Sequence, residues 1–311
     1  MSRSEPFSNR EAAMSTDSAV QAVKPREERW RREASFFDGW AQRSSDDALP
    51  IDPLAFRRYT RPVLRRRFNK EFRFRVMGDL GGKSLLDVGC GDGLNAVMLA
   101  KMGANVTGID VSPKAIELAR RRGEVNGVSD RLSLIAAPLE TADLPPDTFD
   151  LVWADGILHH VLDDLELVLD RLTRWVKPEG LLVFAEPVNL FHPLRQLRFM
   201  IPVETEATPD ERPLVRSEVE LIRRYVPDLR VRHYSLFGRL DQFILIKFNY
   251  ERSSPLRRAI VNGIDFLDYG LLSLPGVKRL GGSCVMYGHP AKASVPPPDG
   301  RKRPDRTVSQ S

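Results

Sequence analysis

Residues 85–93 read LLDVGCGDG, an apolar run followed directly by a short glycine-rich loop. After Asp87, the glycines recur at every second position, as Gly89, Gly91 and Gly93. Glycine lets the backbone turn sharply and lets a bound molecule approach it closely. A dinucleotide loop would have the spacing GxGxxG, but position 94 is Leu94, and no Gly-Lys-Ser/Thr of a P-loop follows. The spacing D-x-G-x-G-x-G therefore predicts a ligand site after a strand and argues against a loop around a pyrophosphate.

The chain around this loop alternates between short apolar runs and helical patterns. Five runs rich in leucine or β-branched residues predict strands at 84–89, 105–110, 132–137, 149–154 and 181–186. Helical periodicity fills the intervals at 93–102, 113–126 and 163–176. Two further strands are expected at 229–238 and 283–289, with a helical insert at 250–280 before the last one. The alternation predicts an α/β fold with a seven-stranded, mostly parallel, doubly wound sheet.

The segments outside the sheet have different compositions. The aromatic residues Trp30, Phe36, Phe37 and Trp40 recur near helical spacing, and an arginine-rich helix is expected at 53–77. These aromatics either belong to a lid over the ligand site or pack in the core. We expect a disordered tail at 1–25, an N-terminal helical lid at 26–78, the sheet domain at 79–292 and a second disordered tail at 293–311.

Composition limits the class of protein. The 311 residues are 42% hydrophobic, which suffices for one core with a small appendage. The net charge of +5 is consistent with two interpretations. The basic residues either lie on a solvated helix or bind an anionic partner, such as nucleic acid, a membrane surface or an acidic substrate. The two cysteines, Cys90 and Cys284, form no CxxC pair, which argues against a zinc knuckle or disulfide framework. The sequence shows no apolar signal core and no run of about 20 apolar residues, so we expect a cytoplasmic protein.

An acid ends the second expected strand, at Asp110 in VTGIDVS. In doubly wound folds a carboxylate at this place can accept hydrogen bonds from both hydroxyls of a ribose. Ser112 and Pro113 predict the N-cap and first turn of the next helix. The alternative for Asp110 is a role as a second helix cap.

Four motifs together resemble the class I S-adenosylmethionine-dependent methyltransferases. They are LLDVGCGDG, VTGIDVSPKAIELA, FDLVWADGILHHV and KPEGLLVFAEP, and they lie in the family's order within residues 83–190, about a third of the chain. The resemblance implies S-adenosyl-L-methionine as cofactor, with its methionine part against the glycine loop. It further implies that Asp87 orients the loop or the cofactor's amino group and that Asp110 binds the ribose.

The other cofactor contacts also rest on this resemblance. The segment AAPLET at 136–141 lacks the family's usual Asp, so Leu139 and Glu140 are the adenine candidates. The nearest likeness is to quinone-biosynthesis O-methyltransferases, whose Asn-x-x-Arg element is here Asn69 and Arg73, one residue too far apart. Arg73 is therefore either a ligand of the cofactor carboxylate or another exposed arginine. The complete cofactor set is Arg73, Asp87, Gly89, Cys90, Gly91, Gly93, Asp110, Val111, Leu139, Glu140, Ala154 and Asp155.

Methyl transfer from a sulfonium needs mainly in-line positioning, and a hydroxyl acceptor often also needs a general base. The base candidates are His159, His160 and His192, with a structural role as the alternative for His160. Asp155, Glu186 and Asn189 only loosely match a catechol-type carboxylate cluster, so no metal is predicted.

The acceptor is expected to be a small molecule. The position after the fourth strand reads ADGIL rather than the Asn/Asp-Pro-Pro-aromatic motif of DNA amino methyltransferases. Neither cysteine is placed to act as a nucleophile for carbon-5 methylation of pyrimidines. We expect transfer to oxygen of an apolar, aromatic or lipid-linked acceptor such as a quinone precursor, with a peripheral contact of the arginine-rich stretch 57–75 to anionic lipid. The alternatives are an RNA or protein methyltransferase that docks through its basic helices, and a binding protein without catalysis; the oligomeric state is not specified.

Overall fold

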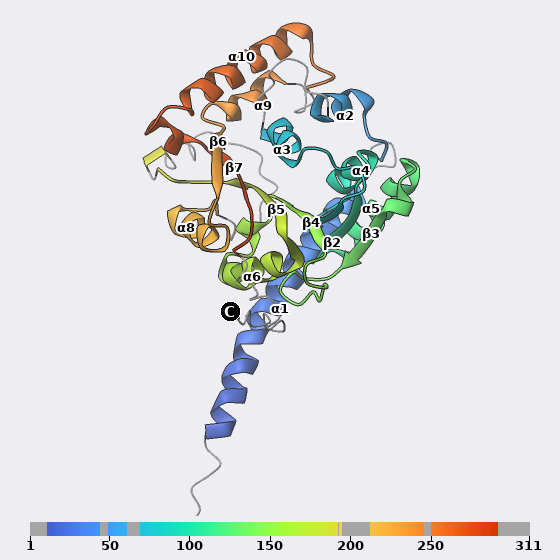
Figure 1. The fold of residues 1–311 in the computed structure, drawn as a ribbon, viewed down its shortest axis with the longest axis vertical. Coiled ribbons are helices and arrows are strands. Elements are labelled where there is room, and N and C mark those ends of the chain that lie inside the picture. Colours follow the sequence, from blue (N-terminus) through green and yellow to red (C-terminus); the bar gives the residue numbers. More distant parts are fainter. Residues whose placement is uncertain are drawn as a thin grey trace, which may run out of the picture.

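A computed structural model describes residues 11–43, 49–60, 69–191, 193–194, 212–245 and 250–291. Its centre is a seven-stranded sheet in the order β3-β2-β1-β4-β5-β7-β6, in which β7 is antiparallel to both neighbours (Figure 1). The strands are β1 (Ser84–Val88), β2 (Asn105–Asp110), β3 (Leu132–Ala136), β4 (Phe149–Asp155), β5 (Val176–Pro187), β6 (Arg230–Tyr234) and β7 (Ser283–Gly288). The predicted fold class is confirmed.

Helices cover both faces of this sheet. They are α1 (Glu11–Arg43), α2 (Pro53–Thr60), α3 (Asn69–Met77), α4 (Leu94–Lys101), α5 (Pro113–Val125), α6 (Leu165–Trp175), α8 (Arg216–Tyr225), α9 (Asp241–Ile244) and α10 (Pro255–Leu271). Within the described residues, no helix is both long enough and apolar enough to cross a membrane.

Two apolar clusters fill the space between sheet and helices. Successive strand residues point to opposite faces, so Leu85 packs with α3 and α4 while Leu86 packs with α6 and α8. Trp153 and Phe184 are fully buried on the two opposite faces. Because both faces are covered, the strands read as continuous apolar runs rather than alternating ones. The carboxyl ends of the parallel strands are then free to carry polar groups.

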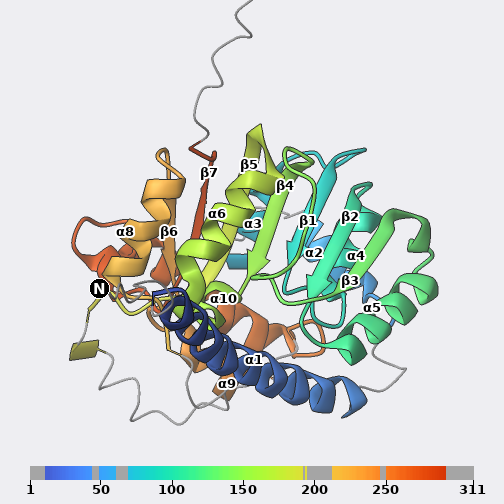
Figure 2. The same ribbon diagram turned by 90° about the horizontal axis from the view of Figure 1, so that it is seen from below.

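Helix α1 differs most from expectation. It begins at Glu11 and therefore includes residues 11–25, for which the sequence predicted disorder. The alanine-rich run after Glu11 has good helix propensity, which the lack of apolar periodicity concealed. Figure 2 shows this long helix beside the sheet, extending from α6 toward α5. It lies along the edge where β2, β3 and β4 end, as its contacts below demonstrate.

Other boundaries differ more modestly. The arginine-rich helix expected at 53–77 contains α2 and α3, while residues 61–68 between them lie outside the described residues. Strand β5 begins five residues earlier than the expected 181, at Val176. Helix α8 was not predicted, although its buried Val219 and Ile222 have helical spacing. The tail at 293–311 also lies outside the described residues.

Candidate functional site

The glycine loop after β1 is shaped by positive backbone angles. Gly89 has a φ of 64°, and a Cβ atom there would lie 2.5 Å from Cδ1 of Ile157. Gly91 has a φ of 51°, and a Cβ atom there would meet nothing within 4 Å. The loop is therefore closed against the protein at Gly89 and open at Gly91, where a ligand can approach the backbone.

Asp87 is buried beside this loop, with 1% of its surface exposed. Burial raises its pKa well above the usual range, and the nearby Asp155 and Asp110 carboxylates raise it further. Within the described part of the chain, its Oδ2 has no hydrogen-bond partner. Because a buried polar atom without a partner is costly, this oxygen suits a donor such as an ammonium group. The site therefore fits the amino group of the expected cofactor.

Asp110 lies at the end of β2 and faces the same loop. Its Oδ2 accepts a hydrogen bond from the Gly91 amide at 2.8 Å, and its Oδ1 accepts one from the Ser112 amide at 2.9 Å. A carboxylate has about four acceptor sites, so capacity remains for two ribose hydroxyls. The N-cap of α5 is Ser112, whose Oγ accepts from the Ala115 amide at 3.0 Å. Burial raises the pKa of Asp110, whereas these backbone hydrogen bonds oppose the rise.

Arg73 and Asp155 come together across the site as an ion pair, from α3 and the end of β4. Arg73 is only 7% exposed, so it is not a solvated surface arginine. Asn95 at the start of α4 donates to Asp155 Oδ2 at 3.1 Å. Burial acts to raise the pKa of Asp155, but the charges of Arg73 and Lys70 outweigh it and lower the pKa.

Lys70 adds a second cation to this side of the site. Burial lowers its pKa to about 8, although Asp155 acts in the opposite direction. Together with Asp87, Asp155 and Arg73, it gives the site charges of both signs, which suit the carboxylate and ammonium groups of a methionine moiety. Lys70 and Asn95 were not predicted from the sequence. Asn95 could have been suspected because it directly follows the glycine loop.

Two histidines follow β4, and one is held by a buried acid on β5. Nδ1 of His159 lies 2.8 Å from Oε2 of Glu186, whose Oε1 accepts the amides of Ile157 at 3.0 Å and Leu158 at 2.8 Å. When Nδ1 donates to a carboxylate, Nε2 is the basic nitrogen of the ring. The ring of His160 lies 4.2 Å from that of His159 and 5.9 Å from Phe37 of α1.

The sequence had considered Glu186 only for a loose carboxylate cluster. In the structure this acid positions His159 and the loop after β4 instead. Among the described residues, no group of three or more His, Cys, Asp and Glu side chains could hold a metal ion. His192 lies outside the described residues.

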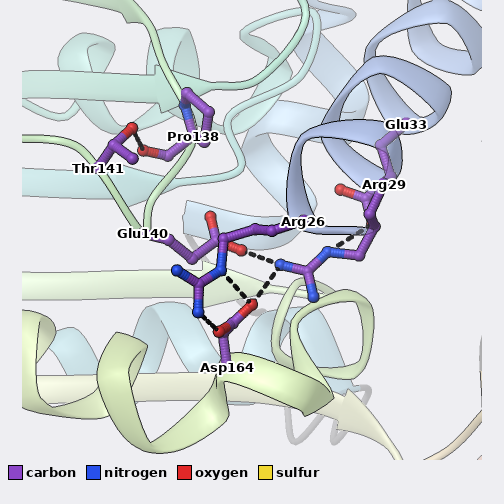
Figure 3. A network of polar contacts seen from close by, with 7 residues as sticks. All are labelled: Arg26, Arg29, Glu33, Pro138, Glu140, Thr141 and Asp164. Atoms are coloured by element: carbon purple, nitrogen blue, oxygen red, sulfur yellow. Dashed lines mark hydrogen bonds and ion pairs between the residues drawn. The ribbon is translucent and has the colours of Figure 1, made fainter. Parts of the chain in front are cut away.

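The two adenine candidates after β3 have different surroundings. Leu139 packs in the apolar core between the sheet and α6, with 7% of its surface exposed. Glu140 pairs with Arg29 of α1, and the same guanidinium donates to Asp164 at 2.8 Å (Figure 3). Arg26 also binds Asp164, through its Nε at 3.1 Å. Helix α1 is therefore fastened directly over the end of β3.

Asp38 extends this contact to the ribose side of the site. Its Oδ1 accepts from Ser112 Oγ at 2.5 Å and from the Lys114 amide at 3.2 Å. A carboxylate at the N-terminus of α5 is favoured by the helix dipole. Asp38 was not predicted from the sequence, because nothing local shows which charged residues of α1 face the sheet.

The remaining candidates lie in the walls of the site. Gly93 has a φ of 77° and packs against Ala119 of α5. Cys90 is buried, and burial raises the pKa of its thiol well above the usual value. Ala154 is 1% exposed, and Val111 is partly buried.

Comparison with known proteins agrees with this geometry. Residues 86–184 match the model of a family described as methyltransferase domain. The mitochondrial ubiquinone biosynthesis O-methyltransferase of Schizosaccharomyces pombe is 37% identical over 113 residues, which are 36% of this chain and 40% of that protein. The ribosomal protein L11 methyltransferase of Actinobacillus succinogenes is 41% identical over 103 residues, 33% of each chain. The matches thus span between a third and two fifths of these relatives.

A solved structure shows the same fold over a larger share of the chain. It is a complex between the Haloferax volcanii Trm112 methyltransferase activator and a methyltransferase, with a TM-score of 0.50 and 19% identity. The similarity covers 84% of this chain and 98% of that one. The matched family model, the sheet order and the glycine loop lead to one conclusion. The chain carries a class I S-adenosylmethionine-dependent methyltransferase domain and is a distant homologue of the ubiquinone biosynthesis O-methyltransferases.

Proposed function

We propose that this protein transfers a methyl group to an oxygen of a small apolar or aromatic acceptor. The observation that carries the proposal is the pair of His159 and Glu186, with 2.8 Å between Nδ1 and Oε2, at the carboxyl ends of β4 and β5. A hydroxyl must lose its proton as it becomes an ether, and a positioned imidazole is the commonest general base. The similarity to ubiquinone biosynthesis O-methyltransferases supports an oxygen acceptor.

The residues of this chain then divide the work between binding and proton transfer. Asp110 would bind the ribose hydroxyls, Asp87 the ammonium group, and Arg73 with Lys70 the carboxylate. The bound cofactor supplies an activated methyl group. Nε2 of His159 receives the acceptor's proton, and the carboxylate of Glu186 stabilises the imidazolium that results.

The acceptor side of the site is proposed to be apolar. Trp30, Phe36, Phe37 and Trp40 of α1 are all partly buried, and Phe37 lies beside His160. We propose that residues 26–78 act as a lid over the site and that the protein acts in the cytoplasm. Exclusion of water by such a lid would strengthen the electrostatic contacts made by Asp87 and His159.

The test begins with calorimetric titration of S-adenosylhomocysteine into the protein and its Asp110→Ala variant. Binding to the wild type that is lost in the variant would support the cofactor site. A panel of phenols and quinols is then assayed with radiolabelled S-adenosylmethionine. We expect His159→Ala to lower kcat by roughly 10²- to 10⁴-fold, the usual contribution of a general base.

The chain offers a matched control for the base. His289 pairs with Asp228 at the same 2.8 Å, but both side chains are about half exposed and lie at the opposite end of the strands. His289→Ala should leave the rate unchanged. Equal rates in the two histidine variants, or absence of S-adenosylhomocysteine binding, would refute the proposal. Methylation of ribosomal protein or RNA in place of every small acceptor would favour the alternative class of substrate.

A further inference from the structure

Helix α10 presents an apolar surface to solvent. It is the outermost helix at its end of the molecule (Figure 1). Nine of its residues are exposed, and eight of these are Pro, Leu, Ala, Ile, Gly or Phe. Leu256 is 71% exposed, Ile260 45% and Leu267 54%, at spacings that place them on one side of the helix. A surface helix ordinarily turns its polar side outward, so this arrangement is inverted.

Two further exposed apolar side chains lie on the elements that adjoin α10 in sequence or by contact. Phe243 of the neighbouring α9 is 65% exposed, and Leu274 after the C-terminus of α10 is 50% exposed. A contiguous exposed patch of large apolar side chains usually marks an interaction site. We refer to Phe243, Leu256, Ile260, Phe266, Leu267 and Leu274 as the α10 surface.

The exposed charged residues of the segment 252–280 are all basic. Arg252 and Arg257 are exposed at the N-terminal end of α10, Arg258 is partly buried, and Lys278 and Arg279 are exposed in the short 3-10 helix Val277–Leu280 that follows α10. The segment 252–280 contains only two acids, Asp265 and Asp268.

Both acids are turned away from solvent. Asp268 is 4% exposed and accepts the Phe237 amide through both oxygens, at 3.1 and 3.0 Å. Asp265 is partly buried, and burial raises its pKa to about 8, with Asp241 and Asp268 adding to the rise. The neighbouring Glu251 is occupied by Arg58 of α2, whose Nε lies 2.5 Å from its carboxylate. The outward side of this segment is therefore apolar at its centre and cationic at its ends.

We propose that the α10 surface docks onto an anionic lipid bilayer. Helices that lie in a membrane interface bury an apolar side among the acyl chains and place basic side chains at the headgroups. Its 17 residues make α10 about 25 Å long, so several side chains can enter the interface together. Self-association is disfavoured, because two copies would bring their cationic ends together. Docking does not depend on which acceptor the enzyme methylates.

The test is flotation of the full chain with two kinds of vesicle, one of phosphatidylcholine alone and one that also contains phosphatidylglycerol. We expect binding to the second kind only, and weaker binding as salt is added. Leu267→Ser should weaken binding on the order of tenfold, the effect of no longer burying one leucine. The control is Val125→Ser on α5. Val125 is 55% exposed, about as much as Leu267, but it does not belong to the α10 surface. This control should bind as the wild type does.

A second pair of variants tests the charges. Arg257→Glu with Lys278→Glu should weaken binding by at least about fivefold for each cation removed. Lys101→Glu with Arg224→Glu makes the same change in net charge at exposed positions elsewhere and should have a much smaller effect. Far-UV circular dichroism verifies that each variant is folded.

Three results would overturn the proposal. The first is absence of binding to either vesicle, and the second is equal binding by the Leu267→Ser and Val125→Ser variants. The third is a dimer in light scattering that Leu267→Ser dissociates, which would make the α10 surface an interface between two copies of the chain.

Discussion

Arg29 is the residue whose removal should most weaken the attachment of α1 to the sheet. Its guanidinium bridges Glu140, which follows β3, and Asp164, which precedes α6 (Figure 3). The side chains of Arg29, Glu140 and Asp164 are 13%, 2% and 9% exposed. Arg29→Ala leaves Asp164 with Arg26 but removes the ion-pair partner that the described residues give the buried carboxylate of Glu140.

The magnitude follows from this burial. Removing one partner of a buried ion pair typically costs roughly 3–5 kcal/mol, since the other charge stays desolvated. Helix α1 lies at the surface, so it can separate locally and admit water to Glu140. We therefore expect the lower end of that range, about 3 kcal/mol. Most of this free energy should be lost from the attachment of α1 to the sheet, because the substitution does not change the two core clusters around the sheet.

The assay combines urea unfolding with hydrogen exchange of α1, and the control is on the same helix. Arg31 is 78% exposed and, among the described residues, pairs with Glu27 at 3.4 Å one turn away, so Arg31→Ala should cost no more than about 0.5 kcal/mol. Arg29→Lys keeps the charge but loses the planar guanidinium that contacts two carboxylates at once. Its loss of unfolding free energy should lie between the losses for Arg31→Ala and Arg29→Ala. Equal unfolding free energies for Arg29→Ala and Arg31→Ala would refute the reasoning.

The same attachment should depend on pH. Burial acts to raise the pKa of Asp164, but hydrogen bonds from Arg26 and Arg29 outweigh it and lower the pKa. A carboxyl whose pKa is lowered by folding stabilises the folded state above its unfolded pKa, near 4, and loses that contribution as the pH falls further. The protection of the α1 amides against hydrogen exchange should therefore decline below about pH 4 in the wild type. The decline should be smaller in Arg29→Ala.

Two further predictions concern single positions. Gly89→Ala should destabilise the domain by more than Gly127→Ala in urea unfolding. Both glycines have positive φ, 64° and 67°, but only at Gly89 does a Cβ atom meet a neighbour, 2.5 Å from Ile157. We expect about 1 kcal/mol at Gly127 from backbone strain and at least about 2 kcal/mol at Gly89, and equal losses would contradict this account of the loop. Asp265→Asn should become stabilising relative to the wild type as pH rises. Burial raises the pKa of Asp265 from 3.8 to about 8, so ionisation opposes folding increasingly through that window, by no more than about 6 kcal/mol. Thermal unfolding at pH 5 and pH 9 measures the difference, and a variant that loses its advantage at pH 9 would contradict the prediction.

The sequence by itself determined the sheet and the cofactor loop, because both depend on near neighbours in the chain. Apolar runs of strand length alternate with helical periods, and this alternation predicts a mostly parallel sheet with helices on both faces. The spacing of Gly89, Gly91 and Asp110 lies within a single strand-helix-strand unit, so local geometry alone brings these residues together.

The tertiary structure alone decided which charged groups meet. Arg29 is separated from Glu140 by 111 residues and from Asp164 by 135, and no local pattern marks either pairing. The same holds for Arg73 with Asp155, and for His159 with Glu186, which two neighbouring parallel strands bring together. Periodicity tells which side of an element is buried, but an ion pair forms only where packing brings two distant elements into contact. The ion pairs of α1 and the positioned histidine could therefore be found only in the folded chain.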